Sequence, residues 1–320
     1  MTCIASIDIG TNTVRLLILE VKPDGNLREA GQARAITRLG EGMETGKRLL
    51  DDRMDETISV LIEFRNKCRE FEPLTIRAVA TSAVREAGNR EEFVSRAKEE
   101  AGVEIEVIPW EKEADLMVKG VLWKLSRAEK DILAFDIGGG STEFILTRGR
   151  KIVSAVGTLL GTVRLTEKFI SHHPIDASEY NALEVHLQRE LKLVKEKLSD
   201  FSPEVLVGTA GTVTTLAAID GNVCPYDPEK IHGKSLTLKR VEELLEDLKR
   251  KSLGERVAME AMEKGREDLI IAGGALTLET MRVFDCDLLT ISEYGLREGI
   301  ALDVVNQGCQ DGQNIKLRPS

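Results

Sequence analysis

The sequence predicts an α/β fold made of two similar domains. Apolar, strand-like runs alternate with helical patterns along most of the chain, which is typical of α/β proteins. The stretch DILAFDIGGGSTEFIL at 131–146 repeats the opening stretch CIASIDIGTNTVRLLIL at 3–19, so that Asp8 aligns with Asp136. Because this spacing is far too long for a solenoid repeat, it indicates a duplicated domain. A length of 320 residues also exceeds what one hydrophobic core usually organises.

The first repeat alternates strands and helices. The expected strands cover 3–21 (two strands joined at Gly10–Thr13), 27–37 and 103–108, and residues 75–85 are expected to form a buried strand that runs into a loop or short helix. The expected helices cover 51–71, 89–102 and 111–125. Apolar residues at helical spacing, with acids in the first turn, indicate the helix at 51–71. Asn89 is the expected N-cap of the next helix, with Glu92 as its capping-box partner, and Gly102 is expected to end it.

A short polar segment, SRAEK at 126–130, separates the two repeats. After it, the expected strands cover 131–140, 141–149, 150–157, 204–208 and 287–291, and the expected helices cover 161–171, 176–199, 238–250, 266–283 and 295–305. We therefore place the domains at 1–125 and 126–305, and the last helix is free to pack on the first domain. The polar residues 306–320 form a tail that we expect to be frayed.

Composition and charge exclude several classes of protein. The chain has 42% hydrophobic and 31% charged residues, which is typical of a soluble globular protein. The formal charge of −10 argues against nucleic acid and membrane surfaces as partners, because both require a cationic face. The five cysteines are scattered without a C-x-x-C pair, which fits a reducing compartment. No apolar run approaches about 18 residues. We therefore expect a cytoplasmic protein.

Both aligned turns consist of small residues, which suits them to binding an anion. They are Gly10–Thr13 and Gly138–Thr142. Small side chains let backbone N–H groups approach phosphate oxygens closely. Neither turn is a P-loop or a dinucleotide fingerprint, since no G-K-[ST] follows and each turn leads into a strand. A glycine hairpin without a ligand is the alternative, and the presence of two copies weighs against it.

An acidic residue precedes each turn, Asp8 in the first copy and Asp136 in the second. Each follows an apolar run that is expected to be a central strand, where burial of an unpaired carboxylate is costly. Mg²⁺ bound to phosphate oxygens is the natural counter-ion, since it commonly takes one or two carboxylates together with phosphate and water. The alternative is a carboxylate that caps its own turn.

These paired hairpins, DIGTNT and DIGGGSTE, resemble the phosphate-binding hairpins of the acetate kinase and actin superfamily. Within it the chain resembles the Ppx/GppA family of exopolyphosphatases and guanosine pentaphosphate phosphohydrolases. Further stretches carry the narrower resemblance: ATSAVREAGNREEF (80–93), IEVIPWEKEADLMVKGV (105–121), GTVRLTEKF (161–169), GTAGTVTTLAA (208–218), YDPEKIHGKSLT (226–237) and SEYGLREGI (292–300). It spans residues 4–303 and implies two ribonuclease H-like domains of the actin-like ATPase type, related by duplication, with an interdomain cleft.

The resemblance assigns the catalytic role to Glu113. Family members hydrolyse a terminal phosphoanhydride with Mg²⁺ and a glutamate that positions or deprotonates water, the second residue of a Glu-Glu-Ala run. Here the run is Glu111-Lys112-Glu113-Ala114, so Lys112 replaces the usual first Glu, and Asp115 replaces a frequent Arg. Glu111 is the alternative base. Without the resemblance, the same charges would indicate only compensation of the helix dipole.

The resemblance also assigns a role to Arg85, whereas the role of Arg15 stays open. Arg85 is expected to hold phosphate oxygens in a planar fork. The alternative is a surface salt bridge from Arg85 to Glu86 or Glu91. Arg15 leaves the first turn at the position that Glu143 has in the second. Its side chain is expected either to contact the substrate or to pair with an acid across the cleft.

By the same resemblance, Glu143 joins Asp8 and Asp136 as a ligand of Mg²⁺. Side chains alternate along a strand, so Ser141 and Glu143 share a face while Thr142 points away. A further small-residue turn opens a helix at Gly208–Thr212 and suits a second phosphate or a nucleotide, or is a feature of the fold alone. The expected substrate-binding residues are Thr11, Asn12, Thr13, Arg15, Arg85, Gly138, Gly139, Gly140, Ser141, Thr142, Gly208, Gly211 and Thr212.

The sequence therefore predicts an exopolyphosphatase that releases orthophosphate from the end of inorganic polyphosphate. Hydrolysis of guanosine pentaphosphate is the nearest alternative. A polyphosphate:ADP phosphotransferase and a non-catalytic nucleotide or alarmone sensor are the others. Longer family members carry an additional C-terminal domain, so we expect a two-domain form that prefers short polyphosphates. A homodimer is expected from the family.

Overall fold

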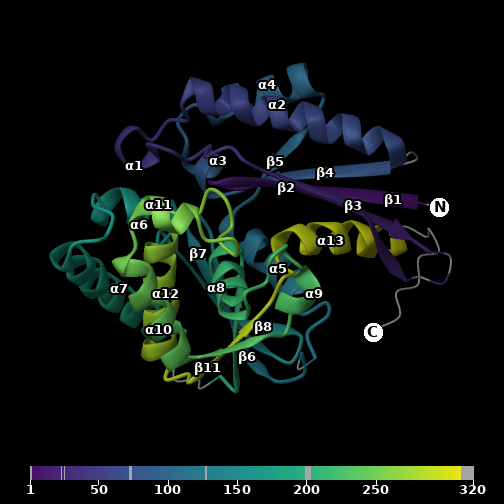
Figure 1. Ribbon diagram of the computed structural model, residues 1–320. Helices are drawn as coiled ribbons and strands as arrows, with labels where there is room; N and C mark the ends of the chain where they lie inside the picture. The colour runs from purple at the N-terminus through teal and green to yellow at the C-terminus, as the bar shows by residue number, and fades with distance from the viewer. Residues whose placement is uncertain are drawn as a thin grey trace. The chain divides into compact units, whose positions relative to one another are not determined.

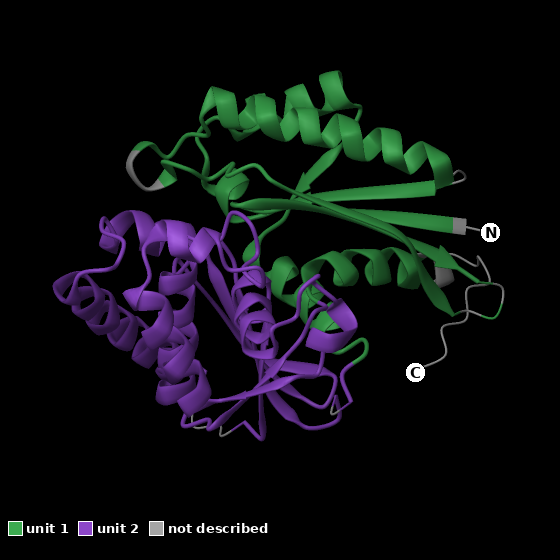
Figure 2. Cartoon of the chain, viewed as in Figure 1, with its two compact units in different colours: residues 1–124, 295–320 green, residues 125–294 purple. Residues whose placement is uncertain are grey.

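The structure is a computed structural model that describes residues 2–22, 24, 26–71, 74–126, 128–198 and 203–310. The chain divides into two compact units, unit 1 (1–124 and 295–320) and unit 2 (125–294), which Figure 2 shows in different colours. Unit 2 is thus one continuous segment, and the last helix of the chain belongs to unit 1. The greater part of the predicted tail, 311–320, lies outside the described residues.

Unit 1 is a five-stranded sheet with helices on both faces (Figure 1). Its strands are β1 (Thr2–Ile9), β2 (Thr13–Val21), β3 (Leu27–Ile36), β4 (Leu74–Ala80) and β5 (Ile105–Val107). Its helices are α1 (Met43–Gly46), α2 (Asp51–Cys68) with a 3-10 turn at Arg69–Phe71, α3 (Ser82–Glu86), α4 (Arg90–Ala101), α5 (Trp110–Val121) and α13 (Leu296–Gln310). The strand order is β3-β2-β1-β4-β5, with β1 antiparallel to β2 and parallel to β4.

Alternating side chains give the sheet of unit 1 two buried faces. Ile7 and Leu16 belong to the cluster that includes α2 and α4, whereas Ile4 and Leu17 pack with α13. Successive side chains of a strand point to opposite faces, so a continuous apolar run fits a sheet that is covered on both sides. The acidic residue Asp8 comes at the end of this run, beside the turn.

Unit 2 is a six-stranded sheet with the order β10-β11-β9-β6-β7-β8. Its strands are β6 (Asp131–Ile137), β7 (Thr142–Arg148), β8 (Lys151–Thr158), β9 (Val205–Thr209), β10 (Ser235–Thr237) and β11 (Leu288–Ile291). Its helices are α6 (Thr162–Phe169), α7 (Ala177–Lys197), α8 (Gly211–Gly221), α9 (Pro228–Ile231), α10 (Leu238–Arg250), α11 (Leu253–Val257) and α12 (Ile270–Val283).

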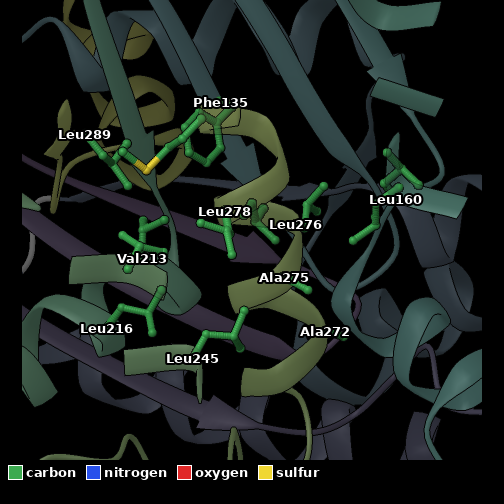
Figure 3. Packing of buried hydrophobic residues seen from close by; sticks show 14 of the residues in the cluster. Phe135, Leu160, Val213, Leu216, Leu245, Ala272, Ala275, Leu276, Leu278 and Leu289 are labelled. Carbon is green, nitrogen blue, oxygen red and sulfur yellow. The ribbon is translucent and has the colours of Figure 1, made fainter. Parts of the chain in front are cut away.

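The core of unit 2 joins the sheet to helices α8 and α12. Phe135 of β6, Val213 of α8 and Leu276 and Leu278 of α12 belong to one buried cluster (Figure 3). Gly208 of β9 lies in the same packing: a Cβ on it would lie 2.9 Å from the Phe135 ring and 3.0 Å from a methyl carbon of Val213. Close packing therefore requires glycine at this position.

The two units repeat one strand order. The series β3-β2-β1-β4-β5 in unit 1 corresponds to β8-β7-β6-β9-β11 in unit 2, where β10 is an added edge strand. The two hairpins also share their register, with Asp8 opposite Arg15 and Asp136 opposite Glu143. The predicted fold class, two ribonuclease H-like domains of the actin-like type related by duplication, is confirmed. The interdomain cleft stays a prediction.

Asn89 is the N-cap residue of α4, as predicted, but the predicted capping box with Glu92 is wrong. The side chain of Asn89 makes no capping hydrogen bond to α4. Its Oδ1 accepts a hydrogen bond from the Leu49 amide at 2.9 Å, and its Nδ2 donates to the Leu49 carbonyl at 3.1 Å. Asn89 is buried, and its side-chain amide forms hydrogen bonds with the backbone of the segment before α2. This tertiary contact takes the place of a capping hydrogen bond. Gly102 ends α4 in the left-handed conformation, as predicted.

Several boundaries differ from the predicted ones. Helix α5 ends at Val121 instead of 125, α12 begins at Ile270 instead of 266, and α13 continues to Gln310 instead of 305. The sequence patterns did not predict α1, α9, β10 and α11, whose lengths are only 3 to 5 residues. Such short elements cannot show a periodicity.

The longest helix of the chain is charged. Helix α7 has 21 residues, and its buried side chains (Leu183, Leu187, Leu191 and Val194) form one stripe with polar residues around it. Among the residues that the structure describes, no helix is both long and apolar enough to cross a bilayer.

Candidate active site

The turn of the first hairpin is held by the segment that follows β3. The Gly10 amide donates to the Thr13 carbonyl at 3.1 Å, which closes the turn. The Thr11 carbonyl accepts from the Gly40 amide at 2.8 Å, and the Asn12 carbonyl accepts from the amides of the next segment, Thr37 and Arg38, at 3.1 Å each. The backbone carbonyls of this turn are therefore directed away from any anion that the turn would bind.

The side chains of this turn are buried and polar. Thr11, Asn12 and Thr13 are each less than 8% exposed. Asn12 Nδ2 donates to Thr13 Oγ1 at 3.3 Å, whereas Asn12 Oδ1 is buried with no hydrogen-bond partner among the described residues. An open acceptor matches water or a hydrated cation better than it matches a phosphate oxygen, which is itself an acceptor.

The turn of the second hairpin is held by the first turn of α6. The Gly138 amide donates to the Ser141 carbonyl at 3.0 Å, as in the first hairpin. The carbonyl of Gly138 accepts from the Thr162 amide at 2.9 Å, and that of Gly139 from the Val163 amide at 2.9 Å. The three glycine carbonyls all accept hydrogen bonds from α6, since Gly140 accepts from the Arg164 Nε at 2.8 Å. This arrangement suits the opposite side of the turn to an anion.

Close packing at the second turn depends on Gly161, the residue before α6. A Cβ on Gly161 would lie 2.2 Å from the Gly139 carbonyl oxygen, a distance that no side chain tolerates. Thr142 contributes to the same packing, because its hydroxyl donates to the Leu160 carbonyl at 2.6 Å. The single hydroxyl proton of Thr142 is thus used in a hydrogen bond within the fold.

The two hairpins carry different pairs of residues directly opposite each other. Asp8 lies opposite Arg15 in unit 1, an acid and a base. Asp136 lies opposite Glu143 in unit 2, two acids. Glu143 is 3% exposed and Asp8 is 8% exposed. Like charges at opposed positions destabilise a strand pair, so the Asp136–Glu143 pair has the donor chemistry that suits a divalent cation.

Glu113 lies in the first turn of α5 and is 6% exposed. Its Oε2 accepts a hydrogen bond from Arg85 Nη1 at 2.6 Å. The same nitrogen of Arg85 donates to the Ile108 carbonyl at 3.1 Å, just before α5 begins. The chain places Arg85 there because β4 ends at Ala80 and the short helix α3 follows directly. The guanidinium therefore orients the carboxylate of Glu113.

The alternative partners of Arg85 are engaged elsewhere. Glu86 accepts from the Ser82 hydroxyl at 2.9 Å. Glu91 pairs with Arg90 at 3.1 Å. Arg85 makes its described side-chain hydrogen bonds through Nη1, so its remaining N–H donors suit a phosphate.

The segment Gly208–Thr212 differs from the two hairpin turns. Gly208 and Thr209 lie within β9, and Ala210, with a φ of 70°, makes the turn into α8. A Cβ on Gly211 would lie 1.9 Å from the Arg266 guanidinium carbon, so this buried side chain covers the start of α8. Arg266 also pairs with Glu263 at 2.9 Å. The sequence pattern places Arg266 at the start of the helix expected at 266–283 and indicates no role for its side chain.

Thr212 packs against α12. A Cβ on Gly273 would lie 2.5 Å from the Thr212 hydroxyl oxygen. Gly273 is therefore required by the contact between α8 and α12. Both residues are buried within unit 2.

A second group of possible metal ligands lies at the start of α7. The ligand atoms of His172, Asp176 and Glu179 lie within 4.8 Å of one another. Asp176 and Glu179 form the capping box of α7, and Glu179 also accepts from the Ser171 amide at 3.1 Å. A hydrogen bond from the Ser171 hydroxyl, together with those from His172 and from the Ser171 and Asp176 amides, lowers the pKa of Glu179 to about 2. The group is explained by its role as a helix cap.

Comparison with known proteins identifies the family. The family model described as the Ppx/GppA phosphatase family matches residues 18–307. Exopolyphosphatase 2 of Mycobacterium tuberculosis is 30% identical over 317 residues, which cover 95% of this chain and 99% of that protein. A solved structure of a Ppx/GppA family member from Aquifex aeolicus has a TM-score of 0.82 and 38% identity, covering 96% of this chain and 98% of that one.

A further relative is longer than this chain. The bifunctional 3-dehydroquinate synthase/phosphatase of Fusobacterium nucleatum is 34% identical over 313 residues, which cover 94% of this chain and 46% of that protein. The chain therefore spans less than half of that relative. The chain belongs to the Ppx/GppA phosphatase family.

Proposed function

We propose that the chain is an exopolyphosphatase that hydrolyses the terminal phosphoanhydride of inorganic polyphosphate. The observation that carries the proposal is the geometry of Glu113, a buried carboxylate in the first turn of α5 that Arg85 holds at 2.6 Å. Family membership supports the reaction class. The similarity to exopolyphosphatase 2 of M. tuberculosis supports the substrate.

In the proposed reaction, water attacks the terminal phosphorus in line with the bridging oxygen. The bond between phosphorus and the bridging oxygen breaks, which releases orthophosphate and leaves a polyphosphate shorter by one phosphate. Glu113 orients the water and accepts its proton, which then passes to solvent or to the departing phosphate. Arg85 has two tasks, since it orients Glu113 and offers its remaining donors to phosphate oxygens.

We propose Mg²⁺ as the cofactor, with Asp136, Glu143 and Asp8 as the residues that would hold it directly or through water. The donor set fits this ion, because it consists of carboxylates and two of them lie opposite each other on neighbouring strands. When bound, the ion would supply charge neutralisation for phosphate oxygens. The turn at Gly138–Gly140 would add backbone N–H donors.

Guanosine pentaphosphate is the second candidate substrate. It ends in the same phosphoanhydride, and the family includes both activities in its name. The residues assigned to chemistry would serve either substrate, because they act on the terminal phosphate alone. We infer that the two substrates differ in the contacts of the departing group, which is either more polyphosphate or a nucleotide.

The test is phosphate release from polyphosphate and from guanosine pentaphosphate, each with and without Mg²⁺. We expect Mg²⁺-dependent release, and we expect Glu113→Gln to lower turnover on the order of 10²–10⁴-fold. Glu111→Gln is the matched control, since Glu111 is an exposed carboxylate of the same helical turn. Formation of ATP in the presence of ADP would indicate a phosphotransferase instead, and binding without release would indicate a sensor. A loss of turnover in Glu111→Gln alone would move the base to that residue.

A further inference from the structure

The helix that carries Glu113 packs backbone to backbone against the last helix of the chain. A Cβ on Gly120 of α5 would lie 1.8 Å from the Gly295 carbonyl oxygen. A Cβ on Gly299 of α13 would lie 1.7 Å from the Leu116 carbonyl oxygen. Both contacts are possible only without a side chain, so α13 determines where the C-terminal half of α5 lies.

An ion cluster around a buried carboxylate makes a second tie, which reaches the first turn of α5. Asp303 of α13 is 5% exposed, and its Oδ2 accepts from Arg77 Nη1 at 2.6 Å and from Lys112 Nζ at 3.2 Å. Its Oδ1 accepts from Lys119 Nζ at 2.7 Å. Gln307 Nε2 donates to Oδ2 at 3.0 Å. One carboxylate therefore joins β4, α5 and α13.

Two other carboxylates balance the charge of this cluster. Asp115 lies 2.8 Å from Lys119 and 3.6 Å from Lys112, and Glu106 lies 3.0 Å from Arg77. Asp303 nevertheless differs from both, because it alone of the three contacts every one of the three cations.

Burial by itself would raise the pKa of Asp303. Hydrogen bonds from Lys119, Arg77 and Lys112 outweigh burial and hold this pKa well below the usual range of a carboxyl group. Asp303 is therefore charged near neutral pH.

The positive charge of Lys112 is unfavourable at this position of α5 unless an acidic group compensates it. It lies in the first turn of α5, where the positive end of the helix dipole disfavours a cation. The hydrogen bond to Asp303 supplies the compensation. Lys112 directly precedes Glu113, so the tie between Lys112 and Asp303 restrains the turn that presents the candidate base. Removal of the charge at Asp303 would leave three cations together around a group that no longer neutralises them.

We propose that Asp303 is a positioning residue for Glu113, acting through Lys112 and Lys119. This inference rests on the proposed function, because it assumes that Glu113 is the base. It assigns no contact with substrate to Asp303. Position 112 suits a cation, since a glutamate there would lie within reach of the Asp303 carboxylate.

The principal test is Asp303→Asn, assayed by phosphate release from polyphosphate with Mg²⁺. We expect kcat to fall on the order of 10- to 100-fold, because small displacements of a catalytic group have effects of this size. KM should change less than kcat. The acid limb of the kcat/KM profile should also move, since it reports the ionisation of the base. Loss of folded protein would lower kcat at every pH without moving that limb.

Asp220→Asn is the matched control. Asp220 accepts from Lys234 at 2.8 Å and from Arg240 at 2.6 Å, so it is also a carboxylate between a lysine and an arginine, but it lies in unit 2. Its replacement should leave kcat and the acid limb as in the wild type. An equal effect of both substitutions would overturn the proposal in favour of general destabilisation.

Lys112→Met tests whether Asp303 acts on Glu113 through Lys112. This variant is expected to fold, because the carboxylate oxygens of Asp303 keep three other hydrogen-bond donors. It should lower kcat with little effect on KM, and Asp303→Asn should have a smaller effect in the Lys112→Met background than alone. Fully additive effects would overturn the route through Lys112. Glu113→Gln separates the two proposals: if it is inactive while Asp303→Asn has the wild-type kcat and acid limb, the positioning role is wrong and the proposed function stands.

Discussion

The β1–β2 hairpin of unit 1 and the β6–β7 hairpin of unit 2 have the same architecture. In both, an amide at the start of the turn donates to the carbonyl three residues later, Gly10 to Thr13 and Gly138 to Ser141. In both, the segment after the third strand donates amides to the carbonyls of the turn. A glycine permits that approach in each case, Gly40 in unit 1 and Gly161 in unit 2.

The same two hairpins differ in charge at equivalent positions. The residue opposite the equivalent aspartate is Arg15 in unit 1 and Glu143 in unit 2. An acid–base pair is balanced within the sheet, whereas two acids favour an added cation. The comparison teaches that duplicated backbones can take different tasks through a single pair of side chains. We therefore assign the greater share of the proposed Mg²⁺ binding to unit 2.

The largest expected effect tests this assignment. Asp136→Asn and Glu143→Gln should each lower kcat by about two orders of magnitude or more and raise the Mg²⁺ concentration that half-activates the enzyme. Arg15→Gln should change the Mg²⁺ requirement much less. Phosphate release measured across a Mg²⁺ titration distinguishes these outcomes.

A stability measurement adds a readout that does not depend on activity. Without Mg²⁺, Glu143→Gln should raise the free energy of unfolding by up to about 1 kcal/mol, because it removes a like-charge pair. Urea unfolding of the inactive variant would measure this. An equal shift of the Mg²⁺ requirement in Arg15→Gln would contradict the assignment to unit 2.

The hairpins were predictable because the signal is local and occurs twice. The repeated apolar run and small-residue turn predicted both hairpins and the positions of Asp8 and Asp136 beside their turns. The helix that carries Glu113 was also predicted, with an end that differs by four residues from the structure (125 against Val121).

Contacts between distant segments were not predictable from local patterns. The tie between Asp303 and Lys112 joins the two ends of unit 1, and neither residue stands in a motif that names the other. Asn89 has the local signature of a helix cap, yet a buried contact with Leu49 decides its role. Gly161 is conspicuous only once α6 is placed on the turn of the second hairpin.

The second prediction compares the glycines that hold the two turns. Gly161→Ala should lower the free energy of unfolding by about 1–3 kcal/mol or more, because its Cβ would meet backbone atoms that cannot yield. Gly40→Ala should be milder, since its Cβ would lie 2.2 Å from Cγ2 of the Thr11 side chain. Thr11→Ser removes that methyl group and should partly rescue Gly40→Ala. The midpoints of urea unfolding of the three variants measure the order of their stabilities. If Thr11→Ser does not rescue Gly40→Ala, the two turns are packed alike.

The smallest expected effect concerns pH and distinguishes the units through histidine. All four histidines, His172, His173, His186 and His232, lie in unit 2. The hydrogen bond of His172 to Glu179 raises the pKa of His172 above its usual value, whereas burial lowers the pKa of His173 and His186.

These shifts have opposite consequences for stability. A raised histidine pKa stabilises the folded state below the unfolded pKa of about 6.5, and the contribution is lost as pH rises through the folded pKa. A histidine pKa that is lowered in the folded state makes the protein lose stability as pH falls. His172→Gln should therefore abolish only the loss of stability toward alkaline pH, which thermal unfolding at pH 6 and pH 8 would detect as a smaller difference in Tm than in the wild type. Since unit 1 contains no histidine, any such response that survives the removal of all four histidines would have to come from another group, and the assignment of this pH dependence to unit 2 would fail.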